Sequence, residues 1–109
     1  MAKLKKFTAD LSVSDFLDVK LKTEKNKVVE FSLNYRAMIG ERYYEVYRID
    51  MAHGYLHEQR YWISPEPIPL DAPSSDLNFN VTFFMSEIKK NFERYKRYFL
   101  QKGGFKYEV

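Results

Sequence analysis

The sequence predicts an α+β fold, an antiparallel β-meander of four or five strands with one long C-terminal helix packed on one face. Apolar and polar side chains alternate over 16–23 and 28–38, which is typical of half-buried strands. Beyond residue 76 the apolar side chains recur every three or four residues, which is typical of a helix. The connections between the early segments are short, so we expect consecutive strands to pair as antiparallel neighbours.

The remaining strands are predicted from composition and from turn residues. Segments 42–51 and 55–63 are rich in aromatic and β-branched residues and are expected to form two further strands. Residues 3–12 are expected to form another strand or an irregular arm. Turns are expected at Asn26, Gly40-Glu41 and His53-Gly54, because these residue types tolerate positive φ.

The 109 residues suit a single domain over 1–109. Its parts are a strand-rich region at 1–63, a Pro-rich loop at 64–75, a helix at 76–102 and a tail at 103–109. Ser75 or Asp76 is expected to cap the helix, and Gly103-Gly104 to end it. The apolar stripe expected to cover the sheet consists of Leu77, Val81, Phe84, Met85, Ile88, Phe92, Tyr95 and Phe99.

Composition excludes several functions. Cys is absent, which rules out disulfides, thiol nucleophiles and cysteine metal sites and fits a cytoplasmic protein. The sequence has neither a long apolar run nor a glycine-rich phosphate loop nor a Gly-x-Ser-x-Gly motif, so we expect no membrane span, no nucleotide cofactor and no serine hydrolase. Many Lys, Glu and Arg with few amides resemble the composition of a thermophile's protein.

The stretch "RIDMAHGYLHEQRYW", residues 48–62, holds both histidines and the one Trp. A two-residue turn at His53-Gly54 would place Asp50 opposite His57 and Arg48 opposite Gln59, all on one face. With Gly40-Glu41 as the preceding turn, that face is the one beneath the helix. A three-residue loop would place the cluster on the open face instead. We prefer the first register, because it collects the cleaner apolar set.

Two interpretations of this cluster stand side by side. Metal-independent phosphodiester cleavage needs an acid/base and a cation, and Arg48, Asp50, His53 and His57 are the candidate catalytic residues. Alternatively, an Arg–Asp–His network satisfies itself and fixes the hairpin. The same histidines and Asp50 have a ligand spacing suited to a helix, but the stretch is strand-like, so we expect no metal and no other cofactor.

Positive charge gathers near the C-terminus. Residues 86–106 carry seven Lys and Arg against two Glu, although the whole chain has a net charge of only +3. Lys89, Lys90, Arg94 and Arg97 are therefore candidate nucleic-acid-binding residues. The alternative is that these cations complement the helix dipole and keep its outer face hydrated.

"YRIDMAHGYLHEQRYW" and "FFMSEIKKNFERYKRYF" together resemble uncharacterised small prokaryotic proteins with an Arg-x-Asp…Ala-His-Gly hairpin followed by a C-terminal helix. They are also similar to the TumE-type toxins of toxin–antitoxin systems. The likeness covers about half of the chain and depends on Arg48, Asp50, His53, Gly54 and His57. It implies a toxin-like ribonuclease that acts on RNA and has a cognate protein partner.

The competing function is a non-catalytic interaction module. Such a module would pair with a protein partner, in the manner of an antitoxin, or with itself as a homodimer. Its expected surface is the face with Tyr43, Tyr47, Ile49 and Trp62, because that set is unusually apolar for a solvated sheet. The expected partners are thus RNA or a protein, and not a membrane.

Overall fold

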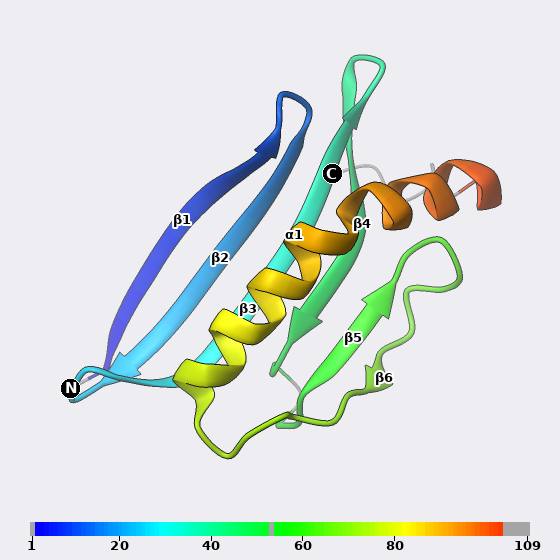
Figure 1. The fold of residues 1–109 in the computed structure, drawn as a ribbon. Coiled ribbons are helices and arrows are strands. Elements are labelled where there is room, and N and C mark those ends of the chain that lie inside the picture. The colour runs from blue at the N-terminus through cyan, green and yellow to red at the C-terminus, as the bar shows by residue number, and fades with distance from the viewer. Residues whose placement is uncertain (1, 53, 104–109) are drawn as a thin grey trace.

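In the computed structural model, which describes residues 2–52 and 54–103, a long helix crosses one face of a six-stranded antiparallel sheet (Figure 1). Strand order follows chain order from β1 to β6, and each strand pairs with the next. The predicted α+β meander with a C-terminal helix is confirmed, with six strands in place of four or five.

The first four strands are long and joined by tight turns. They are β1 (Lys3–Ser12), β2 (Asp15–Glu24), β3 (Lys27–Ile39) and β4 (Arg42–Asp50). Lys25 and Asn26 have positive φ between β2 and β3, and Gly40 has a φ of 67° between β3 and β4. Two of the expected turn residues thus adopt the expected backbone, and residues 3–12 form a strand rather than an arm.

The fourth expected strand, 55–63, is shorter than the sequence suggests. β5 spans only His57–Arg60, because the chain then turns back: the carbonyl of Arg60 accepts hydrogen bonds from the amides of Ile63 at 2.9 Å and Ser64 at 3.0 Å. The sixth strand, β6 (Ile68–Pro69), is a two-residue segment of the expected loop that pairs with β5. The return of this loop to the sheet was not predicted.

The connection between β4 and β5 is also longer than predicted. β4 ends at Asp50, and the amide of Gly54 donates to the carbonyl of Met51 at 3.1 Å, so a two-residue turn at His53-Gly54 is wrong. His53 itself lies outside the described residues. The predicted pairing nevertheless holds, because Arg48 opposes Gln59 and Asp50 opposes His57.

The helix α1 (Leu77–Lys102) begins and ends where the sequence predicts. The carboxylate of Asp76 accepts a hydrogen bond from the amide of Asn78 at 2.9 Å, and Gly103 ends the helix in the left-handed conformation. Within the described part of the chain, no helix is both long enough and apolar enough to cross a bilayer.

The predicted apolar stripe of α1 forms the core with β2, β3 and β4. Phe84 packs on Phe31, and Phe99 lies 5.9 Å from Tyr44 between ring centroids. Val81, Phe84, Ile88 and Phe99 are buried, whereas Leu77, Met85, Phe92 and Tyr95 are partly buried against the same core. The helix therefore covers the middle of the sheet, and Figure 1 shows β1 lying clear of it.

A β-bulge in β4 decides which side chains face the helix. Next to the Gly40 turn, Tyr44 opposes Ala37 in the predicted register. After Glu45 the partner strand advances by one residue while β4 advances by two, so Val46 is the extra residue and Tyr47 opposes Tyr35. Val46 and Tyr47 are consecutive and both buried, which breaks the alternation of faces.

The bulge corrects two predictions. Arg48, Asp50, His57 and Gln59 do not lie beneath the helix but on the opposite, open face of the sheet, because the alternation inverts after Val46. The expected interaction surface is wrong for the same reason. Tyr47 and Ile49 are buried in the core and Trp62 packs on Tyr95, while Tyr43 lies on the other face against Phe16.

Candidate functional site

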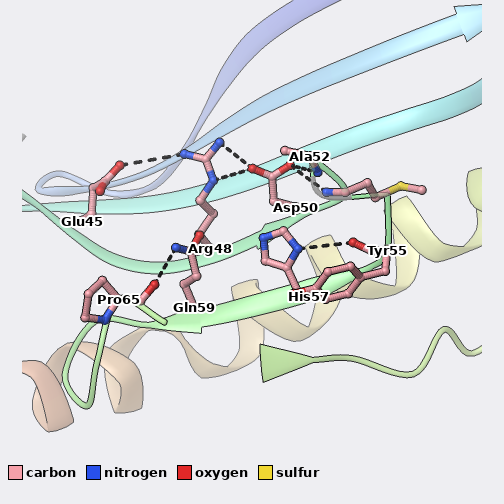
Figure 2. A network of polar contacts seen from close by, with 9 residues as sticks. Glu45, Arg48, Asp50, Ala52, Tyr55, His57, Gln59 and Pro65 are labelled. Atoms are coloured by element: carbon pink, nitrogen blue, oxygen red, sulfur yellow. Dashed lines mark hydrogen bonds and ion pairs between the residues drawn. The ribbon is translucent and has the colours of Figure 1, made fainter. Parts of the chain in front are cut away.

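Arg48 and Asp50 form an ion pair on the open face of the sheet (Figure 2). Nε and Nη2 of Arg48 donate to Oδ2 of Asp50 at 2.9 Å and 2.7 Å. Oδ1 of Asp50 accepts from the amides of Met51 at 2.6 Å and Ala52 at 2.9 Å. Both carboxylate oxygens are thus engaged in holding the chain where it leaves β4.

The surroundings of Asp50 favour its charged form. Burial raises the pKa of this carboxyl group, but the hydrogen bond and the charge of Arg48, with the amides of Ala52 and Met51, outweigh burial and lower the pKa below its usual value. A carboxylate held in this way contributes to stability as long as it is ionised.

We expect Asp50→Asn to lower the free energy of unfolding at neutral pH by about 1–3 kcal/mol, because Arg48 loses its charged partner. Since the folded-state pKa of Asp50 is depressed, its contribution is present above the unfolded-state pKa of about 4 and is lost as pH falls through the folded-state value. Urea unfolding at pH 7 and at strongly acidic pH should therefore show a gap between wild type and variant that narrows in acid. A gap of equal size at both pH values would contradict this role for the ion pair.

His57 is sealed within the protein. Its side chain is only 1% exposed, and Nδ1 lies 3.2 Å from the carbonyl oxygen of Tyr55 (Figure 2). The register places it opposite Asp50, but that carboxylate directs its oxygens to Arg48 and to backbone amides. Nearby, Nε2 of Gln59 donates to the carbonyl of Pro65 at 2.8 Å.

The four candidate catalytic residues are therefore placed unequally. Arg48 and Asp50 are bonded to each other, His57 lies beside them but is inaccessible, and His53 lies outside the described residues. Within residues 2–52 and 54–103, no three His, Asp or Glu side chains gather as metal ligands would. This arrangement favours the interpretation in which the hairpin satisfies its own polar groups.

The open face carries a shallow cavity of about 160 Å³ beside Arg48. Lys20, Lys22 and Ser32 line it together with Arg48 and Asp50. The lining is charged with both signs, since Glu30 also contributes, and His57 does not contribute. Arg48 can thus meet solvent, but His57 does not share its cavity.

A second cavity, which the sequence did not reveal, lies between α1 and the β4–β5 hairpin and has a volume of about 180 Å³. We call it the aromatic groove. Its lining consists of Tyr47, Glu58, Arg60, Trp62, Arg94, Tyr95 and Tyr98. The groove depends on the bulge and on the turn after Arg60, neither of which leaves a clear pattern. The dense mixing of Tyr and Arg in "EQRYW" and "ERYKRY" was the one available signal.

The inner end of the groove is a neutralised polar pair. The hydroxyl of Tyr47 donates to the buried carboxylate of Glu58, and Nη2 of Arg60 lies 2.7 Å from the other oxygen of that carboxylate. Burial first, and then the bond to Glu58, raises the pKa of Tyr47, so its hydroxyl keeps its proton. The groove thus holds a charge that is already balanced.

The rim of the groove is aromatic and cationic. Trp62 stacks on Tyr95 with ring centroids 5.4 Å apart, and the partly exposed Tyr98 lies 5.7 Å from Trp62. Arg60 is about half exposed, and Arg94 is exposed. Flat rings beside guanidinium groups form a surface on which another flat ring can stack.

All four candidate nucleic-acid-binding residues, Lys89, Lys90, Arg94 and Arg97, are exposed on α1. Among the described residues none of the four makes an ion pair, and Arg94 donates instead to the amide oxygen of Asn91. Lys96 differs, because its Nζ lies 3.4 Å from the buried Asp15 and joins the helix to the sheet. Elsewhere, Arg36, Arg48 and Arg60 are each paired with a carboxylate.

Fold and site together define a class: a small α+β protein with a sheet open on one face and a helix whose exposed cations, unpaired among the described residues, lie beside an aromatic groove. The chain belongs to a family of domains of unknown function, DUF7718, whose family model matches residues 1–104. No curated protein and no solved structure matches the chain.

Proposed function

We propose that the protein binds single-stranded RNA along the exposed side of α1 and the adjoining aromatic groove. The observation that carries the proposal is the row of exposed cations on α1 that, among the described residues, make no ion pair and adjoin the aromatic groove. A cation that serves the fold has a carboxylate partner, as Lys96 has in Asp15. Cations that are exposed and lack such a partner remain available to phosphates.

The spacing of the cations supports this ligand. Lys90, Arg94 and Arg97 follow one another at four and then three residues, so they lie along one side of the helix. A row of cations on a helix can track an extended phosphate backbone.

The aromatic groove supports a single strand rather than a duplex. Arg94 belongs both to the row of cations and to the lining of the groove, so a strand that follows the row passes Trp62 and Tyr98. Unpaired bases stack on such rings, and the contact tolerates any base because every base presents a flat face. The proposed contacts are therefore phosphates on α1 and one base at the groove.

The proposal is binding rather than cleavage. His57 is sealed, and the side chains of Arg48 and Asp50 lie on the open face of the sheet, whereas α1 lies on the other face. A strand on α1 would not meet Arg48 and Asp50 without passing around the sheet. The toxin-like ribonuclease stays a prediction from the sequence, as does the cytoplasmic location that an RNA ligand suits.

Reversal of Lys90, Arg94 and Arg97 to Glu should weaken binding of a labelled, unstructured RNA by at least about a hundredfold, and should reduce the slope of log K against log salt by about 2, because three phosphate contacts are lost. Fluorescence anisotropy over a salt series measures both quantities. The matched control reverses Lys20, Lys22 and Lys25, which are exposed cations of β2 and of the turn after it and do not belong to the row on α1. The control should retain the affinity of the wild type.

An equal loss of RNA affinity in the two triple variants would show that binding depends only on the net charge of the protein, and would overturn the proposed site. A wild type that does not bind RNA would overturn the function. Loss of affinity on Tyr98→Ala with an unchanged salt slope would support the stacking contact, because Tyr98 carries no charge. Shortened RNA after incubation with the wild type would contradict a binding-only protein, and His57→Ala would then test whether the hairpin is responsible.

A further inference from the structure

The two edges of the sheet are very different. β6 closes one edge with two residues, one of which is Pro69 and lacks an amide hydrogen, so this edge offers little to another strand. β1 forms the other edge with ten residues. The outward amides and carbonyls of β1 have no strand beside them within the described chain, and α1 does not reach it (Figure 1). A free edge of this length can pair with a further strand.

We propose that two copies of this chain form a homodimer in which their β1 strands pair antiparallel, with Thr8 opposite Thr8 at the two-fold axis. The sheets of the two copies then join into one continuous sheet, with both helices on the same face. This proposal does not depend on RNA binding.

The register follows from geometry and charge. In an antiparallel pair of identical strands, a residue whose backbone amide and carbonyl point away from its own sheet must lie opposite a residue of the same kind in the other copy. Side chains that lie opposite each other share a face of the sheet. Residues at even positions can therefore meet only even positions, and odd only odd. Asp10 is the acidic residue of β1, and Lys6 is the only lysine of the strand on its face. Pairing Lys6 with Asp10 places Thr8 at the axis.

The charges that this register brings together are free in the single chain. Neither Lys6 nor Asp10 makes an ion pair with any other described residue. Because the two-fold axis repeats every contact, Lys6 of each copy meets Asp10 of the other, and the dimer gains two Lys6–Asp10 pairs. Opposite charges in such positions favour association, and like charges oppose it.

Exposed apolar side chains on β1 also support pairing through this strand. Leu4 is 59% exposed and Phe7 is 38% exposed, although both sit in a regular strand. In this register Phe7 meets Ala9 of the second copy, on the face that carries the helices. The shift in register between Asp10 and Ser12 lies beyond these pairs. Pairing would therefore cover Phe7, which the single chain leaves partly in water.

The test is a charge exchange across the axis. Sedimentation analysis of the wild type without RNA should give a dimer. Lys6→Asp and Asp10→Lys should each weaken dimerisation by about tenfold or more, because each replaces two attractive pairs with two repulsive ones. An equimolar mixture of the two variants should dimerise again, since the aspartate introduced into one chain would meet the lysine introduced into the other. The double variant K6D/D10K should also dimerise.

The control is Lys25→Asp, which changes the net charge by the same amount as Lys6→Asp. Because Lys25 lies in the β2–β3 turn and not on β1, this substitution should leave the dimer unchanged.

A wild type that stays monomeric up to millimolar concentration would overturn the proposal. A dimer that both single variants retain, or that their mixture fails to restore, would place the interface elsewhere and would equally overturn it. Circular dichroism of each variant separates these outcomes from misfolding. Restoration in the mixture is itself proof that the separate variants fold.

Discussion

Deletion of Val46 is expected to abolish the native fold, with a loss in free energy of unfolding above about 4 kcal/mol. Val46 is the extra residue of the bulge. It directs Tyr47 and Ile49 toward the helix and Arg48 and Asp50 toward the open face of the sheet. Without it, Tyr47 and Ile49 would turn to the open face, and Arg48 and Asp50 would turn beneath the helix. Charged side chains would then be buried beneath the helix in place of apolar ones, where water could not solvate them.

Urea unfolding followed by circular dichroism measures this loss, and the control is Val46→Ala. That substitution keeps the residue count and therefore the bulge, and it should cost only about 1–3 kcal/mol for the buried methyl groups. A deletion variant that unfolds near the wild-type midpoint would mean that β4 can shift its register without penalty, and that the bulge does not determine the faces of the sheet.

Phe31→Ala is expected to cost about 3–5 kcal/mol, because it removes a large ring from the centre of the core. Phe31 is 2% exposed and lies between β3 and α1, with its ring centroid 6.4 Å from that of Phe84. The neighbouring strands fix the backbone there, so the cavity left by the ring cannot collapse fully.

The matched control is Phe79→Ala, which removes the same ring from a side chain that is 52% exposed on α1. It should change the free energy of unfolding by less than about 1 kcal/mol. Chemical unfolding of both variants gives the comparison. Similar losses at the two positions would show that α1 packs on the sheet through another face than the one described.

The sequence was most informative where structure is local. The limits of α1 follow from Asp76 and Gly103, whose capping roles depend on residues a few positions away. The apolar stripe of the helix is read directly from its period, and the turn at Gly40 from the residue type. These features use backbone geometry that neighbouring residues alone determine.

The candidate site was predicted less well, because it depends on the faces of strands. The pairing of Arg48 with Gln59 and of Asp50 with His57 was predicted correctly, but the side of the sheet on which they lie was not. One inserted residue inverts every later side chain of a strand, and "YYEVYRID" contains apolar and polar residues in positions that suit either face. The accessible aromatic groove was missed for the same reason.

By itself, the sequence determined the α+β class, the antiparallel order of strands, the length and packing face of the helix, and the exposure of its four cations. Each follows from a period or a residue type within one segment. Only the tertiary structure decided that Val46 bulges, that His57 is sealed, that Lys96 meets Asp15, and that Trp62 joins Tyr95 in a groove. These outcomes depend on which residues from distant segments compete for the same space and the same hydrogen bonds, and no local pattern encodes that competition.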